Sequence, residues 1–327
     1  MAMKRAIVTG RHGQDAWYLT NFLTAKGYRV TITSHQPLSS SPRDVLGQSG
    51  KHDDQLDVCT LDLSDSNDCQ QLISSVQPDE VYHLAGPSHI PTCEQSPEET
   101  VDAIAQGTLH LLEATQRSNA TTRFFFASSA EIFGDTEQSP QSESTVPHPR
   151  NIYGVAKRQA QQLVSYYRRK KGQFACSGIL YNHESIRRPT TFVTRKITQA
   201  AARIAVGRQS RLQLGRIDAQ RDWSWAGDFV QAMWLMLQAD EPDDYVVASG
   251  ETHRVQDWLE IAFARVSLDW RKYVDYDPSL ARGGTNKTML VGDATKIRNE
   301  LGWHATVDFV DLVHQMVDHD MQHASGS

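Results

Sequence analysis

Residues 5–16 read Arg-Ala-Ile-Val-Thr-Gly-Arg-His-Gly-Gln-Asp-Ala, and this stretch sets the architecture of the chain. Its first five residues predict a short buried strand, and the two glycines predict a tight turn. The next segment has apolar residues at helical spacing and ends at Gly27, so it predicts a helix. Glycines in such a turn let backbone N–H groups approach a pyrophosphate at the helix N-terminus. The order strand, glycine turn, helix therefore indicates a dinucleotide-binding α/β fold, with Ala16 in place of the usual third glycine.

The same alternation continues through the first half of the chain. Strands are predicted at residues 28–33, 56–61, 80–84, 123–128 and 176–181. Helices are predicted at residues 15–26, 65–76, 98–117 and 153–171. Regular alternation is typical of a parallel sheet with helices on both faces. We therefore predict an α/β protein with a Rossmann-type doubly wound parallel sheet and a smaller α/β C-terminal substrate domain.

The predicted domains are interleaved in the sequence. Residues 1–181 plus about 226–251 are predicted to form the dinucleotide-binding domain. Residues 182–225 plus about 252–327 are predicted to form the substrate domain. A chain of 327 residues is long enough for two such units.

Composition argues against several classes of function. The chain has no run of 18 apolar residues and no signal-peptide pattern at its start, so we expect neither a membrane span nor export. The net charge of -6 argues against a nucleic-acid binder. The 4 cysteines show no paired spacing, which favours the cytoplasm. The 13 histidines are scattered without a known ligand spacing, so no metal is expected.

A tyrosine and a lysine stand four positions apart in residues 151–157, Asn-Ile-Tyr-Gly-Val-Ala-Lys. In a helix this spacing puts Tyr153 and Lys157 on one face. A nearby ammonium favours the phenolate, so we expect Lys157 to lower the pKa of Tyr153. A phenol tuned in this way can take a proton from a sugar alcohol or return one to a ketone. Such a pair also arises by chance, so its weight depends on the motifs around it.

Ser129 and Glu131 follow the predicted strand that ends near residue 128. They are two residues apart, so in an extended segment both side chains point to the same side. Gly10 and the segment 85–88, Ala-Gly-Pro-Ser, also stand at or just past strand ends. Ligands of open parallel sheets bind at the carboxyl ends of the strands. The sequence therefore predicts one site assembled from several strand ends.

The order glycine turn, Ser-x-Glu, Tyr-x-x-x-Lys resembles the extended short-chain dehydrogenase/reductase family. Further strings are similar to the GDP-mannose 4,6-dehydratase family within it, and the resemblance covers nearly the whole chain. They are Gly13–Asp15, Tyr181–Ser185, Phe192–Lys196, Asp218–Trp223, Ala232–Gln238 and Leu301–Trp303. The resemblance implies conversion of GDP-mannose to GDP-4-keto-6-deoxymannose and water, with hydride passing from C4 to the cofactor and then to C6.

The resemblance also implies roles for single residues. The implied catalytic residues are Ser129, at the place of the family's threonine, Glu131 as the base, Tyr153 and Lys157. The implied cofactor-binding residues are Gly10, Gly13, Gln14, Asp15, Asp62, Leu63, Leu84, Ala85, Tyr153, Lys157 and His183. The implied substrate-binding residues are Ser88, Glu131, Asn182, Arg188, Lys196, Arg221 and Arg282. Arginines and a lysine in loops that face the cleft suit a diphosphate.

Three positions depart from the family pattern. The paired arginines that follow the second strand and hold the 2′-phosphate of NADP are His35-Gln36 in this chain. We keep NADP by analogy, with NAD open, and expect weaker discrimination between the two. The family's Arg-Pro-x-Glu segment becomes Arg282-Gly-Gly-Thr-Asn286, which removes an expected ribose contact. The tyrosine two residues after the glutamate is Phe133, which packs but does not hydrogen-bond.

These departures leave alternatives open. The substrate of a dehydratase of this type could be a related GDP-sugar such as a GDP-manno-heptose. A 4-keto-sugar reductase would use the same Tyr/Lys pair and consume NADPH. A non-enzymatic dinucleotide sensor is a third alternative, although it has no need for all four catalytic residues. By analogy, a homodimer or homotetramer is expected.

Overall fold

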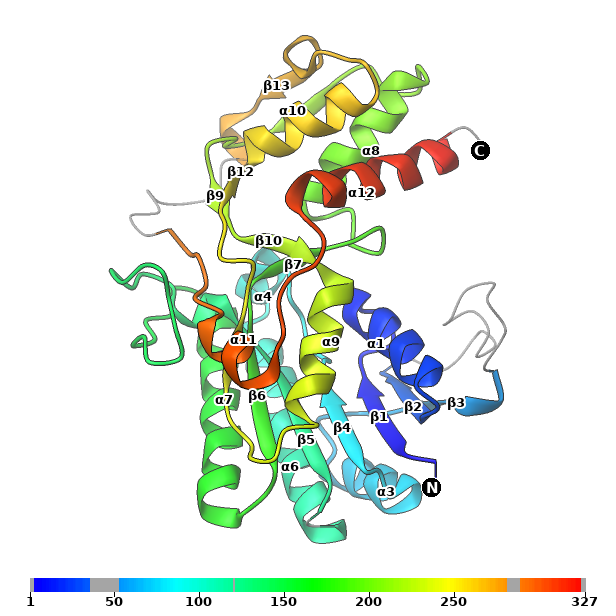
Figure 1. Ribbon diagram of the computed structural model, residues 1–327, viewed down its shortest axis with the longest axis vertical. Coiled ribbons are helices and arrows are strands. Elements are labelled where there is room, and N and C mark those ends of the chain that lie inside the picture. Colours follow the sequence, from blue (N-terminus) through cyan, green and yellow to red (C-terminus); the bar gives the residue numbers. More distant parts are fainter. Residues whose placement is uncertain (1–2, 36–52, 120, 281–288, 325–327) are drawn as a thin grey trace.

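The structure is a computed structural model that describes residues 3–35, 53–119, 121–280 and 289–324. Its main sheet has the strand order β11-β6-β5-β4-β1-β2-β3, and each neighbouring pair is parallel (Figure 1). These strands are β1 (Arg5–Thr9), β2 (Arg29–Ser34), β3 (Leu56–Thr60), β4 (Glu80–His83), β5 (Arg123–Ser129), β6 (Ala175–Leu180) and β11 (Tyr245–Val247). The strand order reverses direction between β1 and β4, which is where doubly wound sheets bind their ligands.

The predicted strands are confirmed, each to within one residue at either end. The predicted helices appear as α1 (Gln14–Ala25), α3 (Ser66–Val76) and α7 (Ile152–Lys171). The helix predicted over residues 98–117 is divided into α5 (Pro97–Val101), a π-helical turn (Asp102–Gln106) and α6 (Gly107–Ser118). The spacing of apolar residues does not reveal a π-helical segment, because such a segment differs from an α-helix by only one extra residue in one turn.

The sheet is covered on both faces, as alternation along the strands requires. Ala6 and Val8 of β1 pack in one apolar cluster with α1, α9 (Ala226–Met236) and α11 (Thr295–Leu301). Ile7 faces the opposite cluster, which α3, α6 and α7 cover. Both faces of the sheet are thus buried. The loops that carry the predicted site residues follow the carboxyl ends of its strands.

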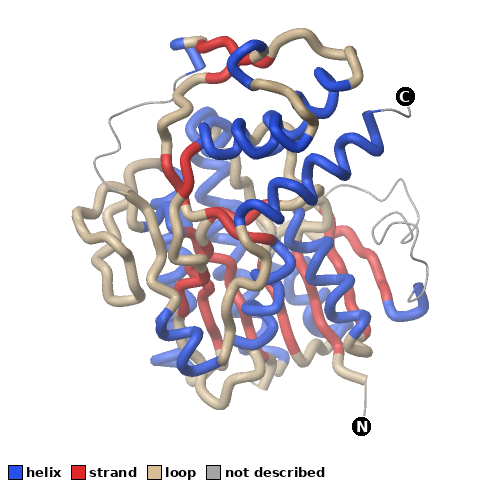
Figure 2. The backbone as a smooth tube through the Cα atoms, turned by 45° about the horizontal axis from the view of Figure 1, so that its top comes forward, coloured by secondary structure: helices blue, strands red, loops and turns tan. Residues whose placement is uncertain are grey.

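A second region lies beyond the carboxyl ends of the sheet strands, at the top of Figures 1 and 2. Helices α8 (Val193–Ala205), α10 (Val255–Arg265) and α12 (Phe309–Ala324) pack around a third apolar cluster that includes Trp258. The short strands pair as β10 (Trp223–Trp225) with β7 (Asn182–Glu184), β12 (His253–Arg254) with β9 (Gln220–Arg221), and β13 (Val274–Tyr276) with β8 (Leu212–Leu214).

The division into two domains stays a prediction, and the packing of α11 bears on where it would be drawn. Ala294, Ile297 and Trp303 belong to the apolar cluster of the sheet, together with α1 and α9. Residues 289–303 thus pack with the sheet region although the sequence assigned them to the substrate domain. Within the described residues, no helix is both long enough and apolar enough to cross a membrane.

Candidate active site

The central strands bring most of the predicted residues to one edge of the sheet. Gly10 follows β1, Leu84 follows β4 and Ser129 ends β5. These three strands are neighbours in the sheet, and β6, which leads to Asn182, is next to β5. The candidate site is therefore the place where the carboxyl ends of these strands face the second region, called the cleft below.

The glycine turn is shaped for close approach of a ligand. Gly10 has a φ of +90°, and a methyl group there would lie 3.0 Å from the Cα of Ala85. Gly13 donates its N–H to the carbonyl of Gly10 at 2.8 Å and is followed by α1. No side chain caps the N-terminus of α1, so its first N–H groups are available to a pyrophosphate. The turn fits a dinucleotide at the place the sequence predicted.

Gln14 and Asp15 join the glycine turn to β7. Gln14 Nε2 donates to the carbonyl of His183 at 3.0 Å, and Ser185 Oγ donates to Gln14 Oε1 at 2.6 Å. His183 Nε2 lies 2.9 Å from Asp15 Oδ2, and its Nδ1 lies 2.7 Å from the carbonyl of Tyr181. Both neighbours of the ring are acceptors, so both ring nitrogens donate and the imidazole is cationic.

The pKa shifts of this pair agree with that charge state. Burial disfavours ionisation of Asp15, but the charge and hydrogen bond of His183 outweigh it and lower the pKa of Asp15. Burial likewise disfavours the charged imidazole, and Asp15 reverses this and raises the pKa of His183. Gln14, Asp15 and His183 thus connect the glycine turn to β7, and this connection is called the tie below. Their contact with a cofactor stays a prediction.

The other predicted cofactor residues line the same edge. Leu84 and Ala85 both donate their N–H groups to Thr9 Oγ1, at 3.0 Å each, which fixes the loop after β4 against β1. Asp62, after β3, accepts from Ser64, and these hydrogen bonds lower the pKa of Asp62. The carbonyl of Leu63 lies 2.8 Å from His110 Nδ1.

Tyr153 and Lys157 lie side by side on α7, as their spacing predicts. Lys157 Nζ donates to the carbonyl of Ala127 at 2.7 Å and lies 5.7 Å from the centroid of the Tyr153 ring. Burial lowers the pKa of Lys157 to about 8. Burial also raises the pKa of Tyr153 well above its usual range, while a hydrogen bond with Ser129 acts in the opposite direction and the charge of Glu131 raises it further. Burial thus raises the pKa of Tyr153, whereas the sequence led us to expect that Lys157 would lower it.

Glu131 is fixed by a residue that the sequence did not single out. Asn151 caps α7, and its Oδ1 accepts from the N–H of Gly154 at 2.7 Å. The same amide donates through Nδ2 to Glu131 Oε2 at 2.8 Å. Gly154 allows this approach, because a methyl group there would lie 2.5 Å from the carbonyl oxygen of Glu131. The cap of α7 thereby orients the predicted base beside Tyr153.

Arg221 of the second region lies near Glu131, and two further arginines, Arg150 and Arg216, lie near Arg221. Arg221, on β9, donates from Nη1 to the carbonyl of Gln220 at 2.7 Å. Burial lowers the pKa of Arg221, the charge of Glu131 opposes this, and the charges of Arg150 and Arg216 lower it further. Arg150, Arg216 and Arg221, here called the arginine cluster, provide the planar donors that a diphosphate prefers.

The other predicted substrate residues are less closely grouped. Arg188 Nε lies 3.1 Å from Oε2 of the buried Glu184, and its guanidinium lies 3.7 Å from the centroid of the Phe192 ring. Its charge also acts on Tyr153, so Arg188 borders the cleft. Lys196 is exposed near the start of α8, and no contact with the arginine cluster is seen for it within the described residues.

Two predicted residues flank the cleft and two lie outside the described part. Ser88 is exposed in the loop after β4, and Asn182 is half-buried at the start of β7. Arg282 and Gln36 lie outside the described residues. Among the residues that are described, no group of three or more His, Cys, Asp or Glu side chains is arranged to hold a metal ion.

Sequence reasoning missed Asn151, Arg150 and Arg216. An asparagine directly before a helix is a capping signal, so the cap of α7 could have been found. The hydrogen bond from Asn151 to Glu131 joins residues 20 positions apart in the sequence, so no local sequence pattern predicts it. Arg216 stands five residues before Arg221 in the sequence, whereas Arg150 lies in another loop and only the fold brings it to Arg221.

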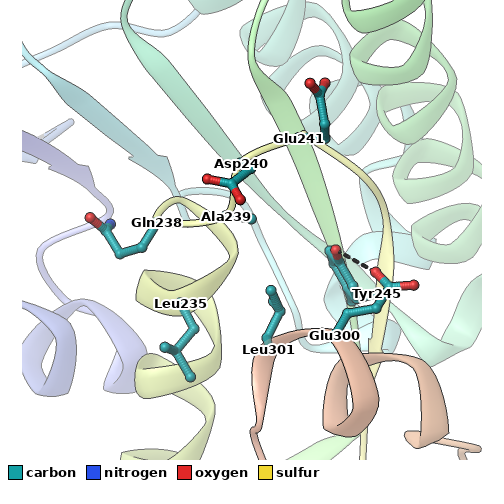
Figure 3. Close-up of a pocket in the computed structure, with 8 residues that line it drawn as sticks. All are labelled: Leu235, Gln238, Ala239, Asp240, Glu241, Tyr245, Glu300 and Leu301. Carbon is teal, nitrogen blue, oxygen red and sulfur yellow. Dashed lines mark hydrogen bonds between the residues drawn. The ribbon is translucent and has the colours of Figure 1, made fainter.

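A shallow surface hollow lies away from this cleft (Figure 3). It is lined by the end of α9, the loop after it and the end of α11, and Tyr245 donates to Glu300 there at 2.9 Å. Tyr245 begins β11, so the hollow is at the amino end of the sheet, opposite to the ligand-binding edge. None of the predicted site residues lines it.

Comparison with known proteins shows the family of the chain. The profile of the family described as GDP-mannose 4,6 dehydratase matches residues 7–316. The chain belongs to the GDP-mannose 4,6-dehydratase family. This family is a branch of the extended short-chain dehydrogenases/reductases, which bind a nicotinamide dinucleotide. The resemblance found in the sequence is thus confirmed over almost the whole chain.

Individual relatives are similar along most of their lengths. The chain is 44% identical to GDP-mannose 4,6 dehydratase 1 of Arabidopsis thaliana, over 98% of this chain and 90% of that protein. It is 37% identical to the GDP-mannose 4,6-dehydratase of Vibrio cholerae, over 98% of this chain and 94% of that protein.

Solved structures show the same fold at lower identity. A UDP-glucose 4-epimerase from Thermotoga maritima superposes with a TM-score of 0.85 at 21% identity, over 98% of this chain and 99% of that one. RMD from Pseudomonas aeruginosa, complexed with NADPH, superposes with a TM-score of 0.82 at 23% identity, over 98% and 100%. At these identities the likeness concerns the fold alone, and it confirms the predicted Rossmann-type architecture with a smaller C-terminal α/β region.

Proposed function

We propose that this protein is a GDP-mannose 4,6-dehydratase that converts GDP-mannose to GDP-4-keto-6-deoxymannose and water. The observation that carries the proposal is the placement of Glu131, whose carboxylate is held by Asn151 beside the Tyr153–Lys157 pair. A reductase needs a tyrosine and a lysine to exchange one proton with a carbonyl. A dehydratase needs a second base as well, because it also removes a carbon-bound proton and expels water.

The residues at the glycine turn and at the strand ends fit NADP as the cofactor. Gly10, Gly13 and the N-terminus of α1 would hold its pyrophosphate, and Leu84 and Ala85 would border it. When bound, the nicotinamide accepts a hydride from C4 of the mannose ring and later returns it to C6. RMD, which shares the fold, has NADPH bound, and this supports the choice of cofactor.

Tyr153 would take the proton of the C4 hydroxyl as the hydride leaves C4, so that a ketone forms. Tyr153 has to be ionised to act as this base, and burial opposes ionisation by raising its pKa. The Lys157 ammonium, 5.7 Å from the centroid of the Tyr153 ring, would favour the phenolate. The bond of Lys157 to the carbonyl of Ala127 fixes the ammonium on the correct side of the ring. Ser129 would supply a further hydrogen bond to the phenolate, since its hydroxyl lies close enough to act on the pKa of Tyr153.

Glu131 would perform the elimination. The new ketone at C4 acidifies the proton on C5, which the Glu131 carboxylate removes. The same group, now protonated, gives the proton to the C6 hydroxyl, the C6–O bond breaks and water leaves. Tyr153 would give the proton that it took from the C4 hydroxyl to C5 as the hydride is returned to C6, so every proton is accounted for and the cofactor ends each cycle in its starting oxidation state.

The arginine cluster would hold the diphosphate of the GDP-sugar. Arg221, on β9, is close enough for the charge of Glu131 to act on it, so a diphosphate bound there would place the sugar near the base. Mass spectrometry after incubation with GDP-mannose and a trace of NADP tests the proposal. The expected product is lighter than the substrate by one water, with no net change in reduced cofactor. Stoichiometric loss of NADPH, or no product at all, would contradict it.

A further inference from the structure

A buried carboxylate follows Arg221 directly in the sequence, between β9 and β10. Asp222 is 0% exposed. Its Oδ1 accepts from the N–H of Ser249 at 3.0 Å and from Ser249 Oγ at 2.6 Å. Its Oδ2 accepts from the N–H groups of Gly250, at 3.0 Å, and Gly292, at 3.2 Å. Each oxygen of the carboxylate thus accepts two hydrogen bonds, which fixes the side chain in one orientation.

The donors to Asp222 belong to the sheet region rather than to the second region. Ser249 and Gly250 follow β11, the outermost strand of the main sheet, at its carboxyl end. Gly292 lies against the same place, because a methyl group there would lie 2.3 Å from the Cβ of Ala248. Asp222 therefore joins a strand of the second region to the carboxyl end of the sheet, where the candidate site lies.

This anchor also decides which way Arg221 faces. Neighbouring side chains of an extended segment point to opposite sides. β9 ends at Arg221 and β10 begins at Trp223, so the chain is extended on both sides of Asp222. Because Asp222 points toward the loop after β11, Arg221 points away from that loop. The charge of Glu131 acts on Arg221, which places the guanidinium on the side of the predicted base.

We propose that Asp222 is a positioning residue of the GDP-sugar site, which fixes β9 to the sheet so that Arg221 presents its guanidinium to the diphosphate. This inference rests on the proposed function, in which Arg221 binds the diphosphate, and it deepens that function. Asp222 acts without touching the substrate, because its oxygens are buried and bound by groups of the protein. Orienting Arg221 in advance lowers the entropy lost when the ligand binds, and the gain is measured as affinity.

Calorimetric titration with GDP measures this role without any turnover. Asp222→Asn keeps the size of the side chain, but its NH2 group faces two of the donors from which a carboxylate oxygen accepts. We expect the dissociation constant for GDP to rise by roughly three- to tenfold, the usual worth of one hydrogen bond. Wild-type affinity for GDP in the folded Asp222→Asn variant would overturn the positioning role.

The double variant separates positioning of Arg221 from other effects of Asp222. If Asp222 acts through Arg221, the variant that combines Arg221→Gln with Asp222→Asn should bind GDP about as weakly as Arg221→Gln alone. Circular dichroism checks that each variant is folded. Losses of affinity that multiply would show that Asp222 affects GDP binding by another route, and the inference would be wrong.

Asp228→Asn is the matched control, because Asp228 is another buried carboxylate held by several donors. It is 0% exposed and accepts from the N–H and Oγ1 of Thr306, at 2.8 and 2.7 Å, and from the N–H of Val307, at 3.2 Å. It lies on α9, and its donors follow α11. Asp228→Asn should lower the melting temperature and leave the affinity for GDP unchanged. An equal loss of affinity in this control would reduce the effect of Asp222 to general stability and contradict the inference.

Ser249→Ala decides the question if Asp222→Asn does not fold. It removes the shortest of the four hydrogen bonds to Asp222 and leaves the other three. GDP should bind this variant roughly two- to threefold more weakly. In the Arg221→Gln background the same substitution should cause no further loss. Unchanged affinity for GDP in Ser249→Ala would then count against the positioning role.

Failure of this inference and failure of the proposed reaction give different results. If GDP binding shows the coupling between Asp222 and Arg221 but GDP-mannose is not dehydrated, the positioning role stands and the proposed reaction fails. If GDP-mannose is dehydrated but Asp222→Asn and Ser249→Ala bind GDP as the wild type does, the reaction stands and the positioning role fails. Absence of GDP binding by the wild type would overturn both.

Discussion

The two sides of the cleft differ in burial and in charge. On the sheet side, the side chains of Tyr153 and Lys157 are 9% and 5% exposed, and their pKa values are shifted mainly by burial. On the opposite side, the three members of the arginine cluster are half-buried, and the Arg216 side chain is 37% exposed and paired with Asp218. Proton transfer gains from a dry site, whereas a diphosphate needs donors that it can reach from water. We therefore assign proton transfer to the sheet side and binding of the diphosphate to the side of the arginine cluster.

The largest effect should come from the sheet side. Tyr153→Phe keeps the packing of the ring in the apolar cluster of α7 but removes the hydroxyl that carries the proton. Turnover should fall by roughly 10² to 10⁴, the usual contribution of a positioned acid–base group. The dissociation constant for GDP, measured by calorimetry, should change little. Near-normal turnover would show that Tyr153 does not transfer the proton, and the assignment of the chemistry to the sheet side would then be wrong.

On the arginine side, the effect should appear in substrate binding. Arg221→Gln removes a charged donor, and a hydrogen bond to a charged group contributes about 1.5 to 3 kcal/mol, or roughly 10- to 10²-fold. Steady-state kinetics should show this factor mainly in KM for GDP-mannose. Arg298→Gln is the control, because Arg298 is exposed on α11. A loss confined to kcat would show that Arg221 serves the chemistry instead.

The tie between the glycine turn and β7 should have a smaller, pH-dependent effect on stability. The folded pKa of His183 is raised above 6.5, so its contribution is complete below that pH and is lost as pH rises through the folded value. The folded pKa of Asp15 is lowered, so its contribution is present above 3.8 and is lost as pH falls through the folded value. Asp15→Asn should therefore cost most between these limits, on the order of 1 kcal/mol, and less in alkali.

Urea unfolding at pH 5.5 and at pH 9 measures this difference. Asp275→Asn is the control, since Asp275 pairs with Arg211, which does not titrate in this range. Its cost should be the same at both pH values. An equally constant cost for Asp15→Asn would mean that His183 is neutral and that the tie does not depend on charge.

The sheet side was largely predictable from sequence, because its signals are local. Apolar alternation located β1 to β6, the spacing of Tyr153 and Lys157 placed them on one face, and Ser129 was found from the end of its strand. The shift of the Tyr153 pKa was not predictable. Its direction depends on how deeply α7 is buried against the sheet, and no local pattern reports that depth.

The arginine side was predictable only in part. Arg221 was found through the family resemblance, whereas Arg150 and Arg216 come from separate loops that only the tertiary fold brings together. Asn151 has a local role as a cap and a distant one toward Glu131, and the sequence reveals only the first. Sequence patterns thus located the elements that carry the chemistry, and the structure supplied the contacts between those elements.

The contrast between Tyr153 and Glu131 is tested most directly by Glu131→Gln in a single turnover. The amide keeps the size of the side chain but does not take the C5 proton. The protein is loaded with NADP and mixed with GDP-mannose, and the absorbance of reduced nicotinamide is followed. We expect reduced cofactor to accumulate with little dehydrated product, because oxidation at C4 needs Tyr153 and Lys157 and elimination needs Glu131. Formation of the 4-keto-6-deoxy product at the wild-type rate would contradict this account.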